Sequence, residues 1–169
     1  KVSIVGSGNW GSAASTIIGR NAKRLALFDP TVRMWCFEEM VDGKKLSETI
    51  NTTHVNAKYL PRHTLPENVV AVPDVVDACI GADVLVFVVP HQFLAKTCAT
   101  LKGKLAPNAV AISLIKGIDF DAKGVVLMSD VIERELGVPC SVLSGANIAD
   151  EIADGKFCES TIGFTSAEA

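Results

Sequence analysis

Residues 2–13 of the chain read VSIVGSGNWGSA, in which three glycines are spaced as G-x-G-x-x-G. The apolar residues before the glycines predict a β-strand over Val2–Val5, and the small residues after them suit a helix, expected over Trp10–Arg20. The glycine spacing alone is common, but a strand before it and a helix after it are the context of a phosphate-binding turn. The stretch therefore predicts an α/β domain that opens with a strand–turn–helix unit.

Each glycine of this turn has its own physical role. Gly6 permits the tight turn, and Gly8 lets a pyrophosphate approach the backbone because no Cβ stands in the way. Gly11 lets the helix pack close to the strand. The diphosphate would rest on free N–H groups at the helix start, where the macrodipole favours negative charge. The turn therefore predicts a dinucleotide site, with a tight turn that holds no ligand as the alternative.

The rest of the chain alternates short apolar runs with segments of helical periodicity, the pattern of βαβ units around a parallel sheet. Further strands are predicted at Val32–Phe37, Val69–Val72, Val84–Val89, Ala109–Leu114, Ser141–Leu143 and Thr161–Phe164. Further helices are predicted at Glu38–Asn51, Asp74–Ile80, Gln92–Leu101, Gly124–Leu136 and Ile148–Asp154. Residues 51–66 are the least regular stretch and are expected to wrap around the surface. The predicted fold is a Rossmann-type, doubly wound, mostly parallel sheet.

Charge and hydropathy exclude several classes of partner. The chain has 16 Lys and Arg against 19 Asp and Glu, with no basic run, so nucleic acid is not an expected partner. Its longest apolar runs are far shorter than the roughly 20 residues of a membrane span, and no targeting segment is visible. The mean hydropathy of +0.32 fits parallel strands covered on both faces, or an apolar face that meets a neighbouring domain.

Metal-binding and nucleophile motifs are missing from the sequence. His54 and His63 lie far from any cysteine pair or acidic cluster with ligand spacing, and no G-x-S-x-G elbow occurs. None of the cysteines forms a C-x-x-C pair, so we interpret them as reduced core residues of a cytosolic protein. They are Cys36, Cys79, Cys98, Cys140 and Cys158. The chain thus offers a cofactor site without an obvious acid/base pair.

The end of the second predicted strand is where an adenosine ribose would lie. Glu38 and Glu39 follow Phe37 directly, and a carboxylate there can bond the ribose hydroxyls and repel a 2′-phosphate, which would favour NAD over NADP. Alternatively, Glu38 is an ordinary acid at a helix start. Phe37 either covers the adenine or belongs to the core. The residues alone leave these alternatives open, and with them the choice between NAD and NADP.

Three further strand ends carry polar residues, and ligands of open α/β sheets bind outside the carboxyl ends of strands. His91 follows one such strand and either relays protons or only packs at a helix start. Lys116 follows another, and burying a lysine there is costly unless an anion meets it. Lys116 is therefore a candidate phosphate or substrate ligand, with a surface loop lysine as the alternative. Asn147 follows the third strand end.

Six blocks of sequence carry a family resemblance. They read GSGNWG at 6–11, GKKL at 43–46, NAKYLP at 56–61, FVVPHQF at 87–93, SLIKG at 113–117 and GANIA at 145–149. In this order they resemble eukaryotic cytosolic NAD-dependent glycerol-3-phosphate dehydrogenase along the whole chain. The resemblance implies reversible hydride transfer between NADH and dihydroxyacetone phosphate, which gives sn-glycerol 3-phosphate. It also implies a cytoplasmic homodimer.

The same resemblance implies site residues. The cofactor-binding residues would be Gly6, Ser7, Gly8, Asn9, Trp10, Gly11, Phe37, Phe93 and Ala149. Lys116 would be catalytic and would bind the phosphorylated substrate, and Asn147 would be catalytic beside it. Glu38 is not carried over as a principal ligand.

The family continues with a helical C-terminal substrate domain, absent from these 169 residues, that supplies the acid/base lysine and clamps the substrate phosphate. We therefore expect residues 1–169 to be the NAD-binding domain of a two-domain enzyme, with little or no turnover alone. One alternative is the domain of another β-hydroxyacid-type NAD(P) dehydrogenase, against which the SLIKG block argues. The other is a non-catalytic NAD(H) redox sensor, supported only by the missing acid/base group.

Overall fold

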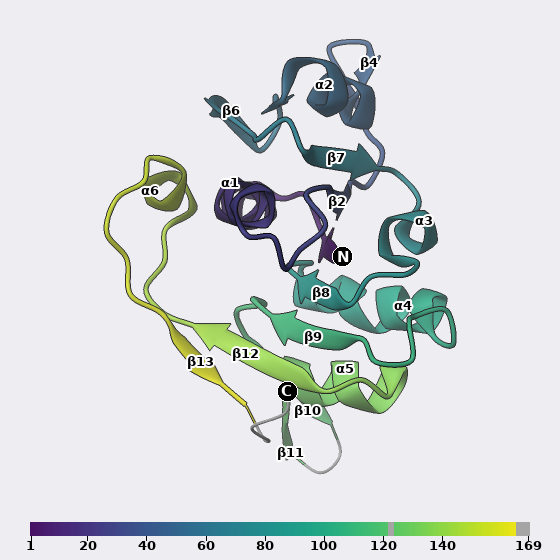
Figure 1. Cartoon of the computed structure of the whole chain (residues 1–169). Coiled ribbons are helices and arrows are strands. Elements are labelled where there is room, and N and C mark those ends of the chain that lie inside the picture. The colour runs from purple at the N-terminus through teal and green to yellow at the C-terminus, as the bar shows by residue number, and fades with distance from the viewer. Residues whose placement is uncertain (122–123, 165–169) are drawn as a thin grey trace.

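A seven-stranded sheet forms the centre of the molecule, as a computed structural model that describes residues 1–121 and 124–164 shows (Figure 1). Its strand order is β13-β12-β9-β8-β1-β2-β7, and every pairing is parallel except that of the edge strand β13. The strands are β1 (Val2–Val5), β2 (Val32–Trp35), β7 (Val69–Val72), β8 (Val84–Phe87), β9 (Val110–Ser113), β12 (Cys140–Ser144) and β13 (Thr161–Gly163). Each lies within one residue or two of its predicted bounds, and the predicted fold class is confirmed.

Helices cover both faces of this sheet. They are α1 (Asn9–Arg24), α2 (Leu46–Thr53), α3 (Val75–Cys79), α4 (His91–Leu101), α5 (Met128–Leu136) and α6 (Ala149–Ala153). One core cluster contains buried residues of α1, α2 and α6, and a second contains those of α3, α4 and α5. In Figure 1, α1 and α6 accordingly lie on one side of the sheet and α3, α4 and α5 on the other.

The topology creates a crevice between β1 and β8. The chain leaves β1 for α1 on one face and leaves β8 for α4 on the opposite face (Figure 1), although the two strands are direct neighbours that pair Val5 with Phe87. Such a reversal of strand order is the point at which open α/β sheets bind ligands. The residues that follow β1 and β8 are therefore placed to form a site.

The predicted helix over Glu38–Asn51 is wrong in its first half. Met40–Val41 (β3) and Lys44–Lys45 (β4) form a small antiparallel hairpin, and the helix begins only after it. Asp42 and Gly43 have φ of 49° and 75°, so both central residues of the turn are left-handed. An Asp-Gly pair favours this two-residue hairpin turn, and that signal outweighs the helical periodicity.

The predicted helix over Gly124–Leu136 also divides into two elements. Gly124–Leu127 (β11) pairs antiparallel with Ile118–Asp121 (β10), and only the following residues form α5. β-branched residues at the start of the segment suit a strand, and Ile118 lies opposite Leu127 in the register. The fully buried residues of this segment lie in its α5 part, and they include Val131 and Ile132.

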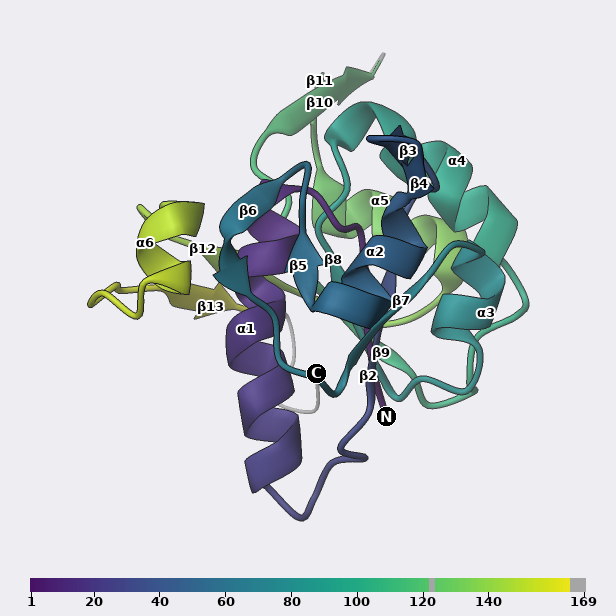
Figure 2. The same cartoon turned by 90° about the horizontal axis from the view of Figure 1, so that it is seen from above.

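Residues 51–66 are more regular than expected. After α2, Val55–Asn56 (β5) pairs antiparallel with Leu60–Thr64 (β6). Seen from above, this β5–β6 hairpin lies beside the start of α1 (Figure 2). Within the described residues, no helix combines the length and apolar character that a bilayer crossing requires.

The cysteines are all free, and four of the five lie in the core as predicted. The exception is Cys158, which is exposed, so its assignment to the core is wrong. Burial raises the pKa of Cys79 and Cys140 to about 12, and that of Cys98 to about 11. These core thiols therefore stay protonated near neutral pH and serve as packing groups.

Candidate functional site

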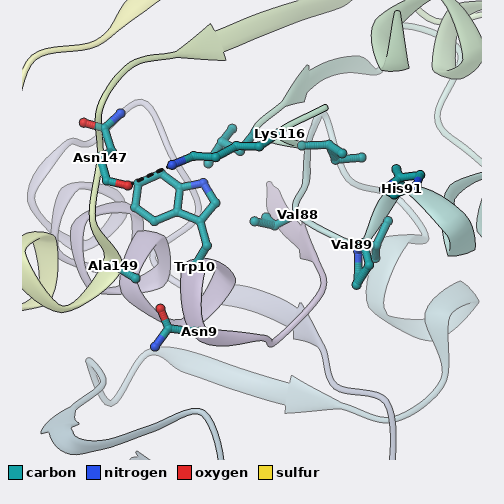
Figure 3. Close-up of a pocket in the computed structure, with 11 residues that line it drawn as sticks. Asn9, Trp10, Val88, Val89, His91, Lys116, Asn147 and Ala149 are labelled. Atoms are coloured by element: carbon teal, nitrogen blue, oxygen red, sulfur yellow. Dashed lines mark hydrogen bonds between the residues drawn. The ribbon is translucent and has the colours of Figure 1, made fainter. Parts of the chain in front are cut away.

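A cleft of about 440 Å³ opens at the carboxyl ends of β1, β8 and β9 (Figure 3). It is lined by Asn9, Trp10, Val88, Val89, Pro90, His91, Leu114, Ile115, Lys116, Asn147 and Ala149. A second hollow of about 270 Å³ shares Trp10, Lys116 and Asn147 with it and continues along the end of β12. Loops that follow four different strands thus contribute to one elongated site.

The three glycines of the β1–α1 turn differ in what surrounds them. A Cβ on Gly11 would lie 2.2 Å from the carbonyl oxygen of Gly6, and one on Gly6 would lie 3.1 Å from the carbonyl carbon of Val88. A Cβ on Gly8 would meet nothing within 4 Å. Gly6 and Gly11 are therefore required by packing inside the protein, whereas Gly8 faces open space.

The start of α1 suits an anion. Gly8 is its N-cap residue and offers no side-chain acceptor, and no acidic residue occupies the first turn. The first N–H groups of a helix have no partner within the helix, and the macrodipole adds partial positive charge there. Together with the open space over Gly8, this arrangement fits a phosphate-bearing ligand.

Lys116 lies over the cleft between two neighbours. Its Nζ donates to the backbone oxygen of Asn147 at 3.0 Å and stands 6.0 Å from the ring centroid of Trp10 (Figure 3). Lys116 is an exposed residue, so the expectation of a costly buried lysine is wrong. Among the described residues, no carboxylate lies within 4.0 Å of its Nζ, so its charge is available to an anionic ligand.

Asn147 is a buried residue whose side chain is hydrogen-bonded. It is 5% exposed, and its Nδ2 donates to Ser160 Oγ at 2.9 Å. Within the described part of the chain, its Oδ1 is buried without a hydrogen-bond partner. A buried acceptor without a partner costs free energy, so Oδ1 is a group that the described residues leave unsatisfied.

Glu38 and Glu39 are engaged by the protein itself. Glu38 accepts from the hydroxyl of Ser47 at 2.6 Å and from its backbone N–H at 3.2 Å, in the first turn of α2. Glu39 accepts from Tyr59 Oη at 2.7 Å and pairs with Lys58. The hydrogen bond from Ser47 lowers the pKa of Glu38, and those from Lys58 and Tyr59 lower the pKa of Glu39. Glu38 thus caps the start of α2 from a position before β3, and it does not itself begin a helix as the alternative interpretation expected.

The remaining predicted site residues divide into two groups. Ala149 and His91 line the cleft, His91 as the first residue of α4. Phe37 and Phe93 are 69% and 54% exposed, so Phe37 is not a core residue, and neither lines the cleft. Across residues 1–121 and 124–164, no cluster of His, Cys, Asp and Glu could hold a metal ion.

The β5–β6 hairpin supports the site from outside the sheet, a contribution that sequence reasoning missed. Asn9 Nδ2 donates to the backbone oxygen of Tyr59 at 2.9 Å, which joins the hairpin to the start of α1. His63 Nε2 lies 2.8 Å from Asp154 Oδ1, at the end of α6. Arg62 lies 3.5 Å from Asp150 within α6. The hairpin therefore connects the glycine turn with the helix that follows Asn147.

Comparison with known proteins agrees with this geometry. Residues 1–169 match the family described as NAD-dependent glycerol-3-phosphate dehydrogenase N-terminus. The chain is 64% identical over 163 residues to the cytoplasmic glycerol-3-phosphate dehydrogenases [NAD(+)] of Rattus norvegicus and of Homo sapiens. These matches cover 96% of this chain and 47% of each relative, so the chain spans about half the length of the curated relatives it matches.

Solved structures show the same relationship. Glycerol-3-phosphate dehydrogenase from Saccharomyces cerevisiae superposes with a TM-score of 0.93 at 48% identity, over 97% of this chain and 47% of that one. The enzyme from Plasmodium falciparum gives a TM-score of 0.94 at 44% identity, over 99% of this chain and 46% of that one. In both, the similarity is to one half of a longer chain.

Proposed function

Because this chain belongs to the family of NAD-dependent glycerol-3-phosphate dehydrogenase N-terminal domains, we propose that it binds NAD(H) across its β1–α1 turn. The open space over Gly8, at the uncapped start of α1, is the observation that carries the proposal. The backbone from Gly6 to Gly11 would hold the diphosphate, and Phe37, Phe93 and Ala149 would contact the rest of the dinucleotide. When bound, NADH supplies the hydride.

Direct titration of the chain with NADH tests this proposal. We expect saturable binding below about 1 mM, read from nicotinamide fluorescence and from tryptophan emission, because Trp10 lines the cleft. Thermal melting of the same sample shows that it is folded and should report a ligand-dependent rise in Tm. A folded sample that shows no saturation at millimolar NADH would contradict the proposal.

We further propose that a protein of the relatives' full length reduces dihydroxyacetone phosphate to sn-glycerol 3-phosphate in the cytoplasm. The exposed ammonium of Lys116 would supply a cation to an anionic substrate, and Asn147, whose backbone oxygen accepts from that ammonium, lines the same cleft. Carbonyl reduction needs a proton as charge develops on oxygen, and a nearby cation stabilises that charge. We propose that a second domain supplies the acid/base group, so residues 1–169 alone should show little turnover. A homodimer of the full-length protein stays a prediction.

The two alternative functions fit these observations less well. Another β-hydroxyacid dehydrogenase would share the fold, but the family match runs over all of residues 1–169. A non-catalytic redox sensor would be favoured by a closed surface over Lys116, whereas this lysine lines an open cleft.

Replacing Lys116 with alanine separates its substrate role from cofactor binding. In a chain of the relatives' full length, we expect Lys116→Ala to lower kcat/KM for dihydroxyacetone phosphate roughly 10- to 100-fold, because one charge-assisted hydrogen bond is lost. The Kd for NADH should change less than twofold. Lys104→Ala, which removes an exposed lysine outside the cleft, is the control. Loss of NADH affinity in Lys116→Ala would mean that this lysine belongs to the cofactor site.

A further inference from the structure

Asn56 is a fully buried polar residue for which the sequence predicts no role. It is 0% exposed, in strand β5. Its Nδ2 donates to the backbone oxygen of Ser7 and to Ser12 Oγ, both at 2.8 Å. Its Oδ1 accepts from the backbone N–H of Tyr59 at 3.1 Å. Both donor hydrogens and the acceptor are thus used; one bond reaches the glycine turn at Ser7, and another reaches Ser12 in the first turn of α1.

The Ser7 carbonyl is held by two donors. Besides Asn56, Ser12 Oγ donates to the same oxygen at 3.1 Å. This carbonyl shares its peptide plane with the N–H of Gly8. Because a trans peptide is planar, its C=O and N–H point in opposite directions. Fixing the Ser7 oxygen toward the buried side chain therefore turns the Gly8 N–H away from the β5–β6 hairpin.

Further hydrogen bonds hold the segment that carries Asn56. Tyr59 receives a hydrogen bond from Asn9 on its backbone oxygen and donates its own hydroxyl to Glu39. Within the hairpin, Val55 pairs with Thr64, and Asn56 itself pairs with Leu60, the residue after Tyr59. Asn56 is therefore anchored by neighbours on two sides before any ligand arrives, which is what a pre-organised binding group requires.

We propose that Asn56 is a positioning residue that orients the Ser7–Gly8 peptide, so that the Gly8 N–H is presented to the cofactor diphosphate. The inference rests on the proposed NAD(H) site. A purely structural role, in which Asn56 only joins the hairpin to α1, is the competing explanation. The two explanations differ in what the loss of Asn56 should change. If Asn56 positions the peptide, its loss changes the Gly8 amide and the cofactor affinity; if it only joins the hairpin to α1, its loss changes only the stability of the protein.

Asn68 provides a matched control. Like Asn56, it donates two hydrogen bonds from its Nδ2, here to the backbone oxygens of Gly19 at 2.9 Å and Pro30 at 2.5 Å, and it too lies beside α1. These bonds are near the other end of the helix, away from the cleft. Asn68→Ala therefore removes a comparable pair of hydrogen bonds without touching the glycine turn.

The experiment compares Asn56→Ala, Ser12→Ala and Asn68→Ala with the unmodified chain in three measurements. These are Tm, the Kd for NADH, and the ¹⁵N–¹H resonance of Gly8 in ligand-free protein labelled with ¹⁵N-glycine, assigned by its absence in Gly8→Ala. We expect Asn56→Ala to move or broaden the Gly8 resonance and to weaken NADH binding roughly tenfold. Asn68→Ala should lower Tm by a similar amount and leave both other readouts unchanged.

Ser12→Ala keeps the test decisive if Asn56→Ala does not fold. It removes one of the two donors to the Ser7 oxygen and should produce the same changes at smaller size. A Gly8 resonance and a Kd that stay unchanged in the folded variants would overturn the positioning role. If the unmodified chain fails to bind NADH, the proposed function fails, while the Gly8 resonance still reports whether Asn56 orients the peptide.

Discussion

Replacing Gly8 with valine is expected to abolish NADH binding while the protein stays folded. Gly8 has φ of −63° and ψ of −174°, a conformation that any residue adopts, and a Cβ there meets no atom within 4 Å. The valine side chain therefore fits the protein but fills the space through which we propose the diphosphate approaches. We expect Kd to rise roughly 100-fold or more, which corresponds to about 2.8 kcal/mol.

Fluorescence titration and thermal melting measure the two halves of this prediction. Gly163→Val is the matched control. Gly163 lies in β13, far from the β1–α1 turn; it also lacks a positive φ and has open space around its Cβ position. It should bind NADH normally. A Gly8→Val protein that binds as tightly as the unmodified chain would place the diphosphate elsewhere and remove the basis of the proposed site.

Replacing Gly11 with alanine is expected to have the opposite result, a loss of stability. The added Cβ would lie 2.2 Å from the oxygen and 3.0 Å from the carbon of the Gly6 carbonyl. Both atoms belong to a tight turn that is itself packed against Val88, so the backbone has little room to give way. Since α1 must shift from β1, we expect the free energy of unfolding to fall by about 3 kcal/mol or more.

Urea denaturation followed by circular dichroism measures this loss. Gly19→Ala, in the same helix, is the comparison, because its Cβ would meet the side chains of Val69 at 2.8 Å and Pro66 at 3.0 Å. Side chains adjust more readily than backbone, and alanine favours a helix over glycine, so the loss should be clearly smaller. Equal stability of the two variants would show that Gly11 does not set the distance between α1 and β1.

The parallel sheet was predictable because its signals are local. Each central strand is a short apolar run, and Val2–Val5 and Val69–Val72 have their predicted bounds. The small hairpins were not predictable from periodicity, because strands of two residues such as β3 and β5 are shorter than any repeat that a window detects. The Asp42-Gly43 pair was the available signal, and the helical interpretation of its surroundings concealed it.

The candidate site likewise contains residues that could be predicted from the sequence and residues that could not. Lys116, Asn147 and Ala149 were expected to lie near the glycine turn, because carboxyl ends of neighbouring parallel strands meet at one edge, and the structure does bring them to one cleft. The partners of Glu38 and Asn56 depend instead on contacts made across turns outside the sheet. Such contacts leave no periodic trace in the sequence, so the roles of these residues could only be found in three dimensions.

The β5–β6 hairpin has a consequence for protein engineering. The strand–turn–helix unit is not self-contained here, because Asn56 and Tyr59 from a distant segment hydrogen-bond to its turn. Transplanting residues 2–24 into another scaffold would leave the Ser7 carbonyl without its buried amide donor. If Asn56 orients the Ser7–Gly8 peptide as we propose, a graft that keeps nucleotide affinity would have to carry residues 54–65 with it, as a second piece in a fixed orientation.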